Sequence, residues 1–214
     1  MLLKLIPSGF FSRQARKPEG VFGRYLMSYL FRKGNEALNR MVLSHMEITE
    51  TDCVLEVGFG PGSLIKALLE TAPGCRIYGI DFSRTMLQSA SKLNQSGITS
   101  GQVQLILADS THLPFPDHSF NKLCTVNTIY FWSNPQQQLK ELYRVLKPGG
   151  KLVIGFRDAE TLDSLNLDRQ VFQLYSTTEV TELLNQSGFD YAQSFQRSDG
   201  PLPSKVAEGI KAKV

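Results

Sequence analysis

A glycine-rich segment and three carboxylates are the parts of this sequence whose spacing most clearly suggests chemistry. In Gly58–Gly62 every second residue is glycine, and Glu56 precedes the segment by two residues. Asp81 and Asp109 each follow a later apolar run. A glycine-rich turn lets a ligand approach the backbone, and an acid about 20 residues further on can accept hydrogen bonds from both ribose hydroxyls. The pattern predicts a nucleoside-binding site.

The spacing of the glycines separates two kinds of nucleoside ligand. A dinucleotide fingerprint requires G-x-G-x-x-G, whereas this segment is G-x-G-x-G and Ser63 stands at the third dinucleotide position. Glu56 would repel a pyrophosphate but would attract an ammonium group. A nicotinamide-dependent oxidoreductase is therefore the weaker of the two interpretations.

The elements that must position these residues alternate between strand-like and helical patterns. Such alternation is typical of βαβ units around a parallel sheet, whose ligands bind at the carboxyl ends of the strands. Asn127, at the exit of the fourth expected strand, joins the acids as a candidate. The expected strands are Cys53–Val57, Arg76–Ile80, Val103–Leu107, Leu123–Val126, Leu152–Phe156, Tyr191–Phe195 and Val206–Val214.

Helical periodicity accounts for much of the remaining chain. We expect polar loops at Asn94–Gly101 and Leu113–Asp117, and about 20 residues after the fifth strand have weak periodicity. The fold class that follows is one doubly wound α/β domain, with a helical extension over residues 1–49 and a core over residues 50–214. The expected helices are Phe22–Leu30, Leu38–His45, one from Leu64 to near Gly74, one capped by Ser83, one from Pro135 to the turn at Pro148–Gly150, and Thr177–Ser187.

Composition excludes several classes of protein. The 214 residues are 42% hydrophobic and 20% charged, which is typical of a globular domain. The net charge of +3 is too small to require nucleic acid as a partner. The cysteines lack metal-ligand spacing, and no apolar run reaches the ~20 residues of a membrane span, so we expect no metal and a cytoplasmic protein. A local basic cluster comprises Arg13, Arg16, Lys17, Arg24, Arg32, Lys33 and Arg40.

Four ordered segments resemble the motifs of class I S-adenosylmethionine-dependent methyltransferases. Val54–Gly62 is similar to motif I of that family, and Tyr78–Ser83 is similar to the segment whose acid holds the ribose. Ala108–Phe115 resembles the adenine-contacting loop, and Glu141–Gly150 resembles the helix and turn before the fifth strand. The resemblance covers roughly residues 50–190 and is nearest to the small-molecule branch, including quinone-biosynthesis methyltransferases. It implies a seven-stranded sheet whose last strand is antiparallel.

The resemblance also implies a role for each matching residue, with S-adenosylmethionine as the cofactor. The methionine part would be held by Glu56 and by the backbone from Gly58 through Phe59 and Gly60 to Gly62. The ribose hydroxyls would bind Asp81. The adenine pocket would be formed by Phe82, Met86, Asp109 and Ser110, and Asn127 would lie near the sulfonium. For several of these residues a simpler reading stays open: helix caps for the two aspartates, core packing for Phe82 and Met86.

The acceptor side is less well determined by the sequence. Methyl transfer needs alignment and exclusion of water, and a general base is optional. The weak catalytic candidates are Tyr130, in the aromatic segment after the fourth strand, His112, three residues beyond Asp109, and Arg24. We expect a small-molecule methyl acceptor, no nucleic-acid partner and no transmembrane segment, and homo-oligomerisation stays open.

Residues up to about Tyr25 are the candidate lid, because Lys17–Tyr25 combines glycines with aromatic and cationic side chains. We expect this lid to cover the acceptor and to contribute little to the cofactor site. The second interpretation is a protein that binds S-adenosylmethionine without turnover, since motifs that bind a cofactor do not by themselves indicate a reaction.

Overall fold

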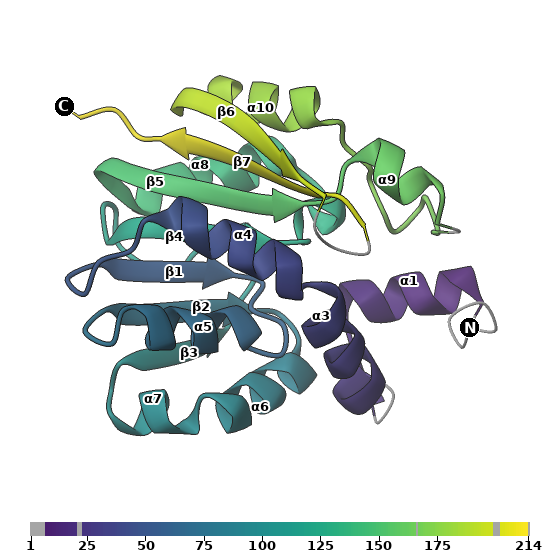
Figure 1. Ribbon diagram of the computed structural model, residues 1–214, viewed down its shortest axis with the longest axis horizontal. Helices are drawn as coiled ribbons and strands as arrows, with labels where there is room; N and C mark the ends of the chain where they lie inside the picture. Colours follow the sequence, from purple (N-terminus) through teal and green to yellow (C-terminus); the bar gives the residue numbers. More distant parts are fainter. Residues whose placement is uncertain (1–6, 21–22, 166, 199–201, 214) are drawn as a thin grey trace.

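The protein is built on one seven-stranded sheet, seen in the computed structural model of residues 7–20, 23–165, 167–198 and 202–213 (Figure 1). The strand order is β3-β2-β1-β4-β5-β7-β6. The strands are β1 (Cys53–Val57), β2 (Arg76–Asp81), β3 (Val103–Leu107), β4 (Phe120–Val126), β5 (Leu146–Phe156), β6 (Asp190–Arg197) and β7 (Ser204–Ile210).

The direction of the strands confirms the expected fold. Parallel pairing links β1 to β2 and β4, β2 to β3, and β4 to β5, whereas β7 is antiparallel to both β5 and β6. The chain moves outward from β1 through β2 to β3 and then returns to β4 on the other side of β1. The order therefore reverses between β1 and β4, and a crevice is expected at the carboxyl ends of those two strands.

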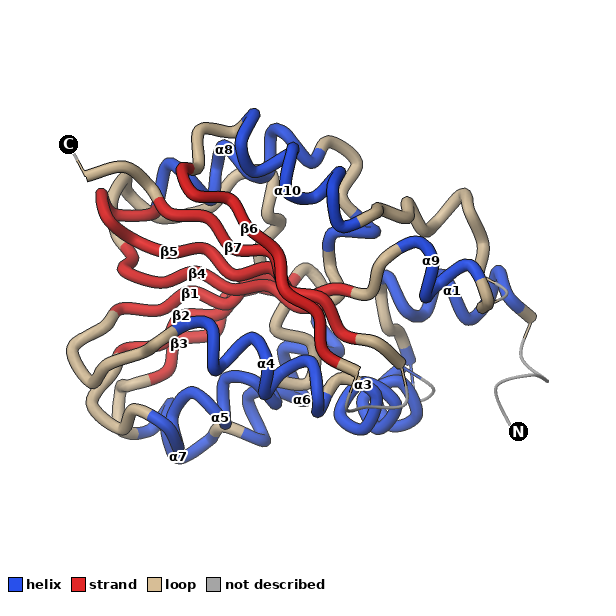
Figure 2. Tube along the Cα trace, turned by 45° about the horizontal axis from the view of Figure 1, so that its top comes forward, coloured by secondary structure: helices blue, strands red, loops and turns tan. Residues whose placement is uncertain are grey.

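Helices cover both faces of the sheet, as Figure 2 shows, with α8 and α10 on one face and α4, α5 and α7 on the other. Each face has its own buried apolar cluster; the first includes Leu139 and Leu183, and the second includes Leu38 and Leu64. The helices are α1 (Ser8–Arg16), the π-helix η2 (Gly23–Met27), α3 (Ser28–Gly34), α4 (Glu36–Met46), α5 (Ser63–Thr71), α6 (Arg84–Leu93), α7 (Gln95–Thr99), the 3-10 helix η3 (Ile129–Phe131), α8 (Pro135–Val145), α9 (Ala159–Asp163) and α10 (Thr177–Gln186).

Local sequence accounts for where several helices begin. The Ser83 hydroxyl accepts a hydrogen bond from the N–H of Met86, so Ser83 caps α6 as expected. Asn134 caps α8 in the same way and Pro135 takes its first position. At α10, Ser176 and Glu179 form a reciprocal capping box.

Some boundaries differ from the expected ones. The segment Asn94–Gly101, expected as a loop, contains the short helix α7, whose Gly97 lies so close to Leu69 and Val103 that a Cβ atom there would clash with both. Tight packing therefore outweighs its polar composition. β5 begins at Leu146, so the Pro-Gly-Gly turn lies within the strand that pairs with β4 and β7.

The expected helix Phe22–Leu30 falls partly outside the described residues, and η2 and α3 cover its remainder. Two further short helices, α1 and α9, lie in segments for which no helix bounds are predicted from the sequence.

Of the helices before β1, α4 packs on a face of the sheet, whereas α1 and α3 lie beyond the ends toward which the β1 and β5 arrows point (Figure 1). Arg157, directly after β5, donates hydrogen bonds to the carbonyl of Gly34 at 2.8 Å and to those of Leu202 and Pro203 at 2.8 and 3.0 Å. The hydroxyl of Ser83 donates to the carbonyl of Pro18 at 2.9 Å. The N-terminal segment is thus joined to the carboxyl edge of the sheet at separate points.

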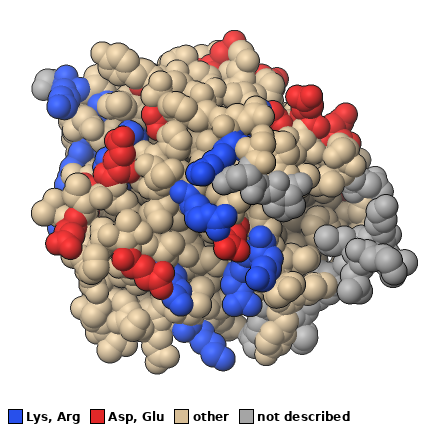
Figure 3. Space-filling view, viewed as in Figure 1, with Lys and Arg blue, Asp and Glu red and all other residues tan. Residues whose placement is uncertain are grey.

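Basic and acidic side chains are interspersed on the face that Figure 3 shows. Arg32 and Lys33 of α3 are exposed, and Arg40 of α4 pairs with Glu36 at 2.9 Å. Among the described residues, acidic side chains therefore interrupt the basic ones on this face. Within the described residues, no helix has both the length and the apolar character needed to span a membrane.

Candidate functional site

A cavity of about 350 Å³ opens at the carboxyl ends of β1, β2, β3 and β4. The residues that line it fall into three groups. The strand-end half comprises Glu56, Val57, Gly58, Phe59, Gly60, Pro61, Ser63, Leu64, Ile80, Asp81, Phe82, Met86, Ala108, Asp109, Ser110, Val126, Asn127 and Thr128. The apolar half comprises Phe11, Ala15, Phe31, Tyr130, Phe131, Trp132, Leu162, Leu165, Leu167, Phe172 and Leu202. The remaining lining residues are Pro18 and the polar or charged Arg16, Asn35, Asn39, Gln138 and Arg157.

The glycine-rich segment forms the tight turn between β1 and α5. Gly58 has a φ of +74°, and a Cβ atom there would collide with the methyl group of Thr128. Gly60 has a φ of +52° but faces open space, with no atom within 4 Å of a Cβ placed there. Gly62 does not line the cavity, because it lies against Asn94 and Ala90 of α6. Gly60 is therefore the glycine that keeps the backbone open to a ligand.

The N–H groups of this turn are used within the protein. Gly58 and Phe59 donate to the carbonyl of Ile80 at 2.8 and 3.3 Å, and Gly62 donates to the carbonyl of Phe59 at 2.9 Å. Gly60 donates to Oδ2 of Asp81 at 2.9 Å. These bonds fix the turn against β2, and they leave it few donors for a ligand.

Asp81 ends β2 and is buried. Its Oδ1 accepts from the N–H of Ser83 at 2.8 Å, and its Oδ2 accepts from Gly60. Burial raises the pKa of Asp81 to about 6, although these two backbone hydrogen bonds oppose the shift. Each carboxylate oxygen has a further lone pair, so Asp81 can still accept two hydrogen bonds from a ligand's hydroxyl groups.

Glu56 lies in β1 and is 3% exposed. Its Oε2 has no hydrogen-bond partner among the described residues. Burial, and secondarily the charge of Asp81, raises the pKa of Glu56 well above its ordinary value. A buried carboxylate oxygen without a partner is costly, and a cationic group in the cavity would relieve that cost.

The residues expected around an adenine line the same half of the cavity. Phe82 is half exposed there and Met86 is buried. Asp109 accepts from the N–H and the hydroxyl of Thr111, both through Oδ1. Ser110 accepts from the side-chain amide of Gln138 at 2.9 Å. An apolar slot bordered by a carboxylate and a hydroxyl suits a flat ring with an exocyclic amino group.

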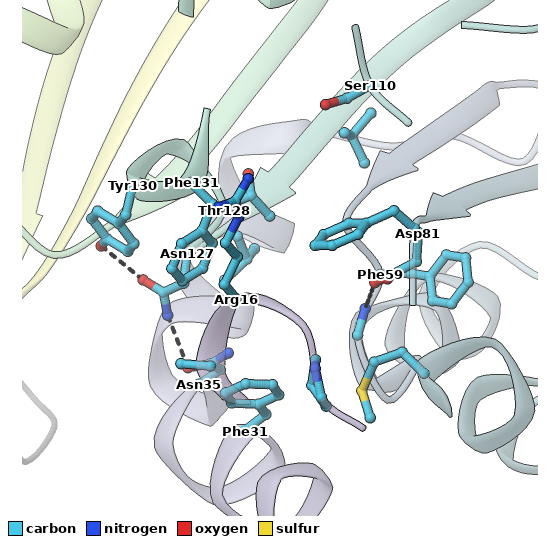
Figure 4. A pocket seen from close by; sticks show the side chains of 18 of the residues that line it. Arg16, Phe31, Asn35, Phe59, Asp81, Ser110, Asn127, Thr128, Tyr130 and Phe131 are labelled. Carbon is cyan, nitrogen blue, oxygen red and sulfur yellow. Dashed lines mark hydrogen bonds between the residues drawn. The ribbon is translucent and has the colours of Figure 1, made fainter. Parts of the chain in front are cut away.

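Asn127 and Tyr130 belong to one hydrogen-bonded chain that reaches the N-terminal helices (Figure 4). Asn127 has a φ of +54° at the end of β4, and its amide donates to Oδ1 of Asn35 at 2.9 Å. The Tyr130 hydroxyl lies 3.0 Å from Oδ1 of Asn127 and accepts from the N–H of Arg157 at 2.5 Å. Burial raises the pKa of Tyr130, so this hydroxyl stays protonated at neutral pH.

The other two catalytic candidates are His112 and Arg24, and neither is seen at the cavity in the described structure. His112 is exposed and does not line the cavity. The side chain of Arg24 lies outside the described part of the structure, as do Val21 and Phe22 of the candidate lid. Of the three candidates, the described structure therefore brings Tyr130 alone to the cavity.

Sequence reasoning missed most of the apolar half. Phe131 and Phe172 meet edge to face with their ring centroids 4.7 Å apart, and Tyr130 lies 5.8 Å from Phe172. Phe11 reaches the same wall from α1. These residues come from distant segments without strong periodicity, and the sequence points to this wall only through the aromatic segment that contains Tyr130.

The strand-end half therefore fits a nucleoside that carries a cationic arm. Asp81 offers acceptors for the ribose hydroxyls, and the unpartnered Oε2 of Glu56 offers one for an ammonium group. The open space at Gly60 admits the ligand. The N–H groups that would hold a pyrophosphate are already bonded within the protein, which disfavours a dinucleotide.

Comparison with known proteins agrees with this chemistry. The methyltransferase domain family matches residues 55–154. The uncharacterized methyltransferase YdaC of Bacillus subtilis is 32% identical over 135 residues, covering 63% of this chain and 72% of YdaC. The demethylmenaquinone methyltransferase of Thermus thermophilus is 37% identical over 102 residues, which are 47% of this chain and 45% of that enzyme. The chain thus spans less than half the length of the Thermus enzyme.

A solved structure extends the likeness over nearly the whole fold. It is the putative methyltransferase in complex with the Trm112 methyltransferase activator of Haloferax volcanii, with a TM-score of 0.79, 20% identity, and coverage of 94% of this chain and 97% of that one. At this identity the likeness establishes the fold. Together with the relationship to YdaC and the family match, it shows that the chain belongs to the S-adenosylmethionine-dependent methyltransferases.

Proposed function

We propose that this protein transfers the methyl group of S-adenosylmethionine to a small apolar molecule bound in the apolar half of the cavity. The observation that carries the proposal is the continuity of the two halves. Polar groups suited to a nucleoside and a wall of aromatic and aliphatic side chains line one cavity. An acceptor in one half can thus meet a methyl group in the other without contact with bulk water.

The proposed cofactor contacts use residues of the strand-end half. Asp81 would accept hydrogen bonds from the ribose hydroxyls, and Phe82, Met86, Asp109 and Ser110 would surround the adenine. Glu56 would bind the ammonium group, while the turn at Gly60 would border the methionine arm. When bound, the cofactor supplies an electrophilic methyl group on a sulfonium sulfur.

The acceptor would be held mainly by shape. Phe131 and Phe172 form an edge-to-face pair, and Phe11 and Leu165 add apolar surface from segments that are far apart in the sequence. A cavity of this volume suits a small molecule. The name of the Thermus relative, a demethylmenaquinone methyltransferase, supports an apolar ring as acceptor. Aromatic faces also favour the positive charge of a sulfonium.

Tyr130 would act by positioning and not as a general base. Its hydroxyl is fully engaged with Asn127 and Arg157, and burial raises its pKa. Asn127, held in a left-handed conformation, would keep the end of β4 in place beside the reacting methyl. In-line transfer from an activated sulfonium needs alignment more than proton removal.

The N-terminal segment would exclude water from the reaction. Phe11 and Ala15 of α1 line the cavity, and Pro18 is tied to Ser83 across its mouth. We therefore propose that α1 and the residues after it form the cover of the acceptor.

A labelled-methyl screen tests the proposal. Radiolabelled S-adenosylmethionine is incubated with panels of phenols, quinols, carboxylic acids, amines and thiols, and label in the acceptor is counted. We expect transfer to apolar ring compounds and a strong loss in Phe172→Leu. The matched control is Phe195→Leu, a phenylalanine outside the cavity. Tight cofactor binding without transfer to any panel would contradict the proposal and favour a binding protein.

A further inference from the structure

Two side chains among the described residues that line the cavity carry a positive charge, Arg16 and Arg157. They differ in how much of their hydrogen-bonding capacity is used. Arg157 is buried and donates to three backbone carbonyls, those of Gly34, Leu202 and Pro203. Arg16 ends α1 and has no hydrogen-bond or ion-pair partner within the described part of the chain. Arg16 is therefore the cation that is free to bind a ligand.

Arg16 reaches into the cavity from the N-terminal side. Figure 4 shows its side chain extending from α1 toward Thr128 and Asn127, at the end of β4. β4 pairs with β1, and a Cβ atom on Gly58 would collide with Thr128, so this end of β4 lies against the glycine-rich turn. The guanidinium is therefore directed at the part of the cavity next to the glycine-rich turn. A ligand whose adenosine lies on the strand ends would extend its remaining part into this space.

The charges of the strand-end half are unbalanced without Arg16. Its three ionisable side chains, Glu56, Asp81 and Asp109, are all acids. The methionine arm of the cofactor is a zwitterion, with an ammonium group for which Glu56 offers a partner. Its carboxylate needs a donor, and a negative group placed near Glu56 without one would be repelled.

The glycine-rich turn cannot serve as that donor in its present form. The N–H groups of Gly58, Phe59, Gly60 and Gly62 already bond within the protein, and Pro61 has none. The hydroxyl of Ser63 at the start of α5 has no partner among the described residues and can add one neutral hydrogen bond. Arg16 alone, among the described lining residues, combines free donors with a compensating charge and a planar fork that matches a carboxylate.

We infer that Arg16 binds the carboxylate of the methionine arm of S-adenosylmethionine. The cofactor would then lie between two parts of the protein, with its adenosine on the strand ends and its carboxylate on α1. This assignment changes the expectation drawn from the sequence, in which residues up to about Tyr25 cover the acceptor and contribute little to cofactor affinity. Under the inference, cofactor binding itself draws α1 over the cavity.

Calorimetry with two ligands tests the inference independently of turnover. S-Adenosylmethionine and decarboxylated S-adenosylmethionine share the adenosine, the sulfonium and the ammonium group, and they differ in the carboxylate. We expect the wild-type protein to bind the complete cofactor more tightly by about 10- to 100-fold. Arg16→Ala should lose most of that preference while its affinity for the decarboxylated ligand stays within about twofold. Arg16→Lys should recover part of it.

Arg13→Ala is the matched control, since Arg13 is an exposed arginine of the same helix that does not line the cavity. It should retain the wild-type preference. An Arg16→Ala protein that keeps the preference would overturn the inference and would leave Arg16 to an anionic acceptor. An equal loss of affinity for both ligands would also overturn it, because the effect would then be a general disturbance of α1. Neither result would contradict methyl transfer itself, which the labelled screen tests separately.

Discussion

The two halves of the cavity are constructed in opposite ways. In the strand-end half, short polar side chains follow adjacent strands and are held by backbone hydrogen bonds, as Asp81 is held by Gly60 and Ser83. In the apolar half, Phe11, Phe131 and Phe172 come from α1, η3 and the segment after α9, and they are held by packing. The first half is a feature of the sheet, whereas the second is an assembly of distant segments.

This difference suggests that the two halves of the cavity have separate functions. Parallel strands deliver their ends to one edge of the sheet, so the strand-end half is fixed wherever the sheet forms. The apolar half can change shape through substitutions that leave the sheet intact, because its residues are not in the central strands. We therefore expect cofactor affinity and acceptor selectivity to respond to different mutations.

The largest expected effect is at Gly60. A valine there would project into the open space at the turn and would block the cofactor's approach, so Gly60→Val should bind no measurable S-adenosylhomocysteine. Its far-ultraviolet circular dichroism should stay near that of the wild type.

Gly101→Val is the control, since Gly101 also has a positive φ, +78°, and open space, yet lies outside the cavity. It carries a similar backbone strain and should bind normally. Normal binding by Gly60→Val would remove the glycine-rich turn from the site.

Asp81→Ala should weaken S-adenosylhomocysteine binding by about 1.5–3 kcal/mol, because two hydrogen bonds to a charged acceptor are lost. Methylthioadenosine carries the same ribose, so its affinity should fall by a similar factor in the same titrations. The affinity should also depend on pH. Because the pKa of Asp81 is about 6, its carboxylate is protonated in more acidic solution and then accepts hydrogen bonds from the ribose less well. Affinity that is unchanged in a folded Asp81→Ala protein would place the ribose elsewhere.

Glu56 should link ligand binding to stability. Burial raises the pKa values of Glu56 and Asp81 above those of the unfolded chain. Their protonation therefore stabilises the ligand-free fold below about pH 4. This stabilising contribution is lost as the pH rises through the pKa values that the two carboxyls have in the folded protein. At pH 8 both carboxyls are charged in the unfolded chain, so folding must either bury the charge or take up a proton, and for Asp81 the cost is roughly 3 kcal/mol.

Glu56→Gln should accordingly raise the melting temperature of the ligand-free protein at pH 8 by at least about 2 °C, while it weakens cofactor binding. The gain in melting temperature should shrink toward pH 4. Glu182→Gln, at an exposed position of α10, serves as the control and should change neither property. A lower melting temperature in Glu56→Gln at pH 8 would show that the buried charge is compensated within the fold.

The smallest expected effect lies in the apolar half. Leu165 is 39% exposed and lines the cavity, so Leu165→Ala should raise the KM for the acceptor a few-fold and leave cofactor affinity unchanged. Ile98 is similarly exposed at 36% but lies outside the cavity, and Ile98→Ala should leave the KM unchanged. Parallel changes in cofactor affinity and acceptor KM would remove the distinction between the halves.

The contrast also explains what the sequence could predict. Each strand-end candidate sits beside a pattern that is local in the chain: a glycine-rich turn after β1, or an acid directly after an apolar run. Gly62 shows the limit, because the pattern identifies the turn but not which glycine faces the ligand and which packs against α6.

The apolar half and Arg16 could not be found in that way. α1 and α9 are short, and their apolar residues line the cavity beside residues that are far away in the sequence, so neither periodicity nor spacing predicts this arrangement. The sequence did place Arg16 in a basic cluster. Only the cavity distinguishes it from Arg13, which belongs to the same helix and stays outside.

A crystal structure of the protein with S-adenosylhomocysteine tests the division into two halves most directly. We expect the ribose hydroxyls on the carboxylate of Asp81, the adenine beside Phe82, and the sulfur at the border with the apolar half. An adenine bound against Phe131 and Phe172, with Asp81 free of the ligand, would contradict the division.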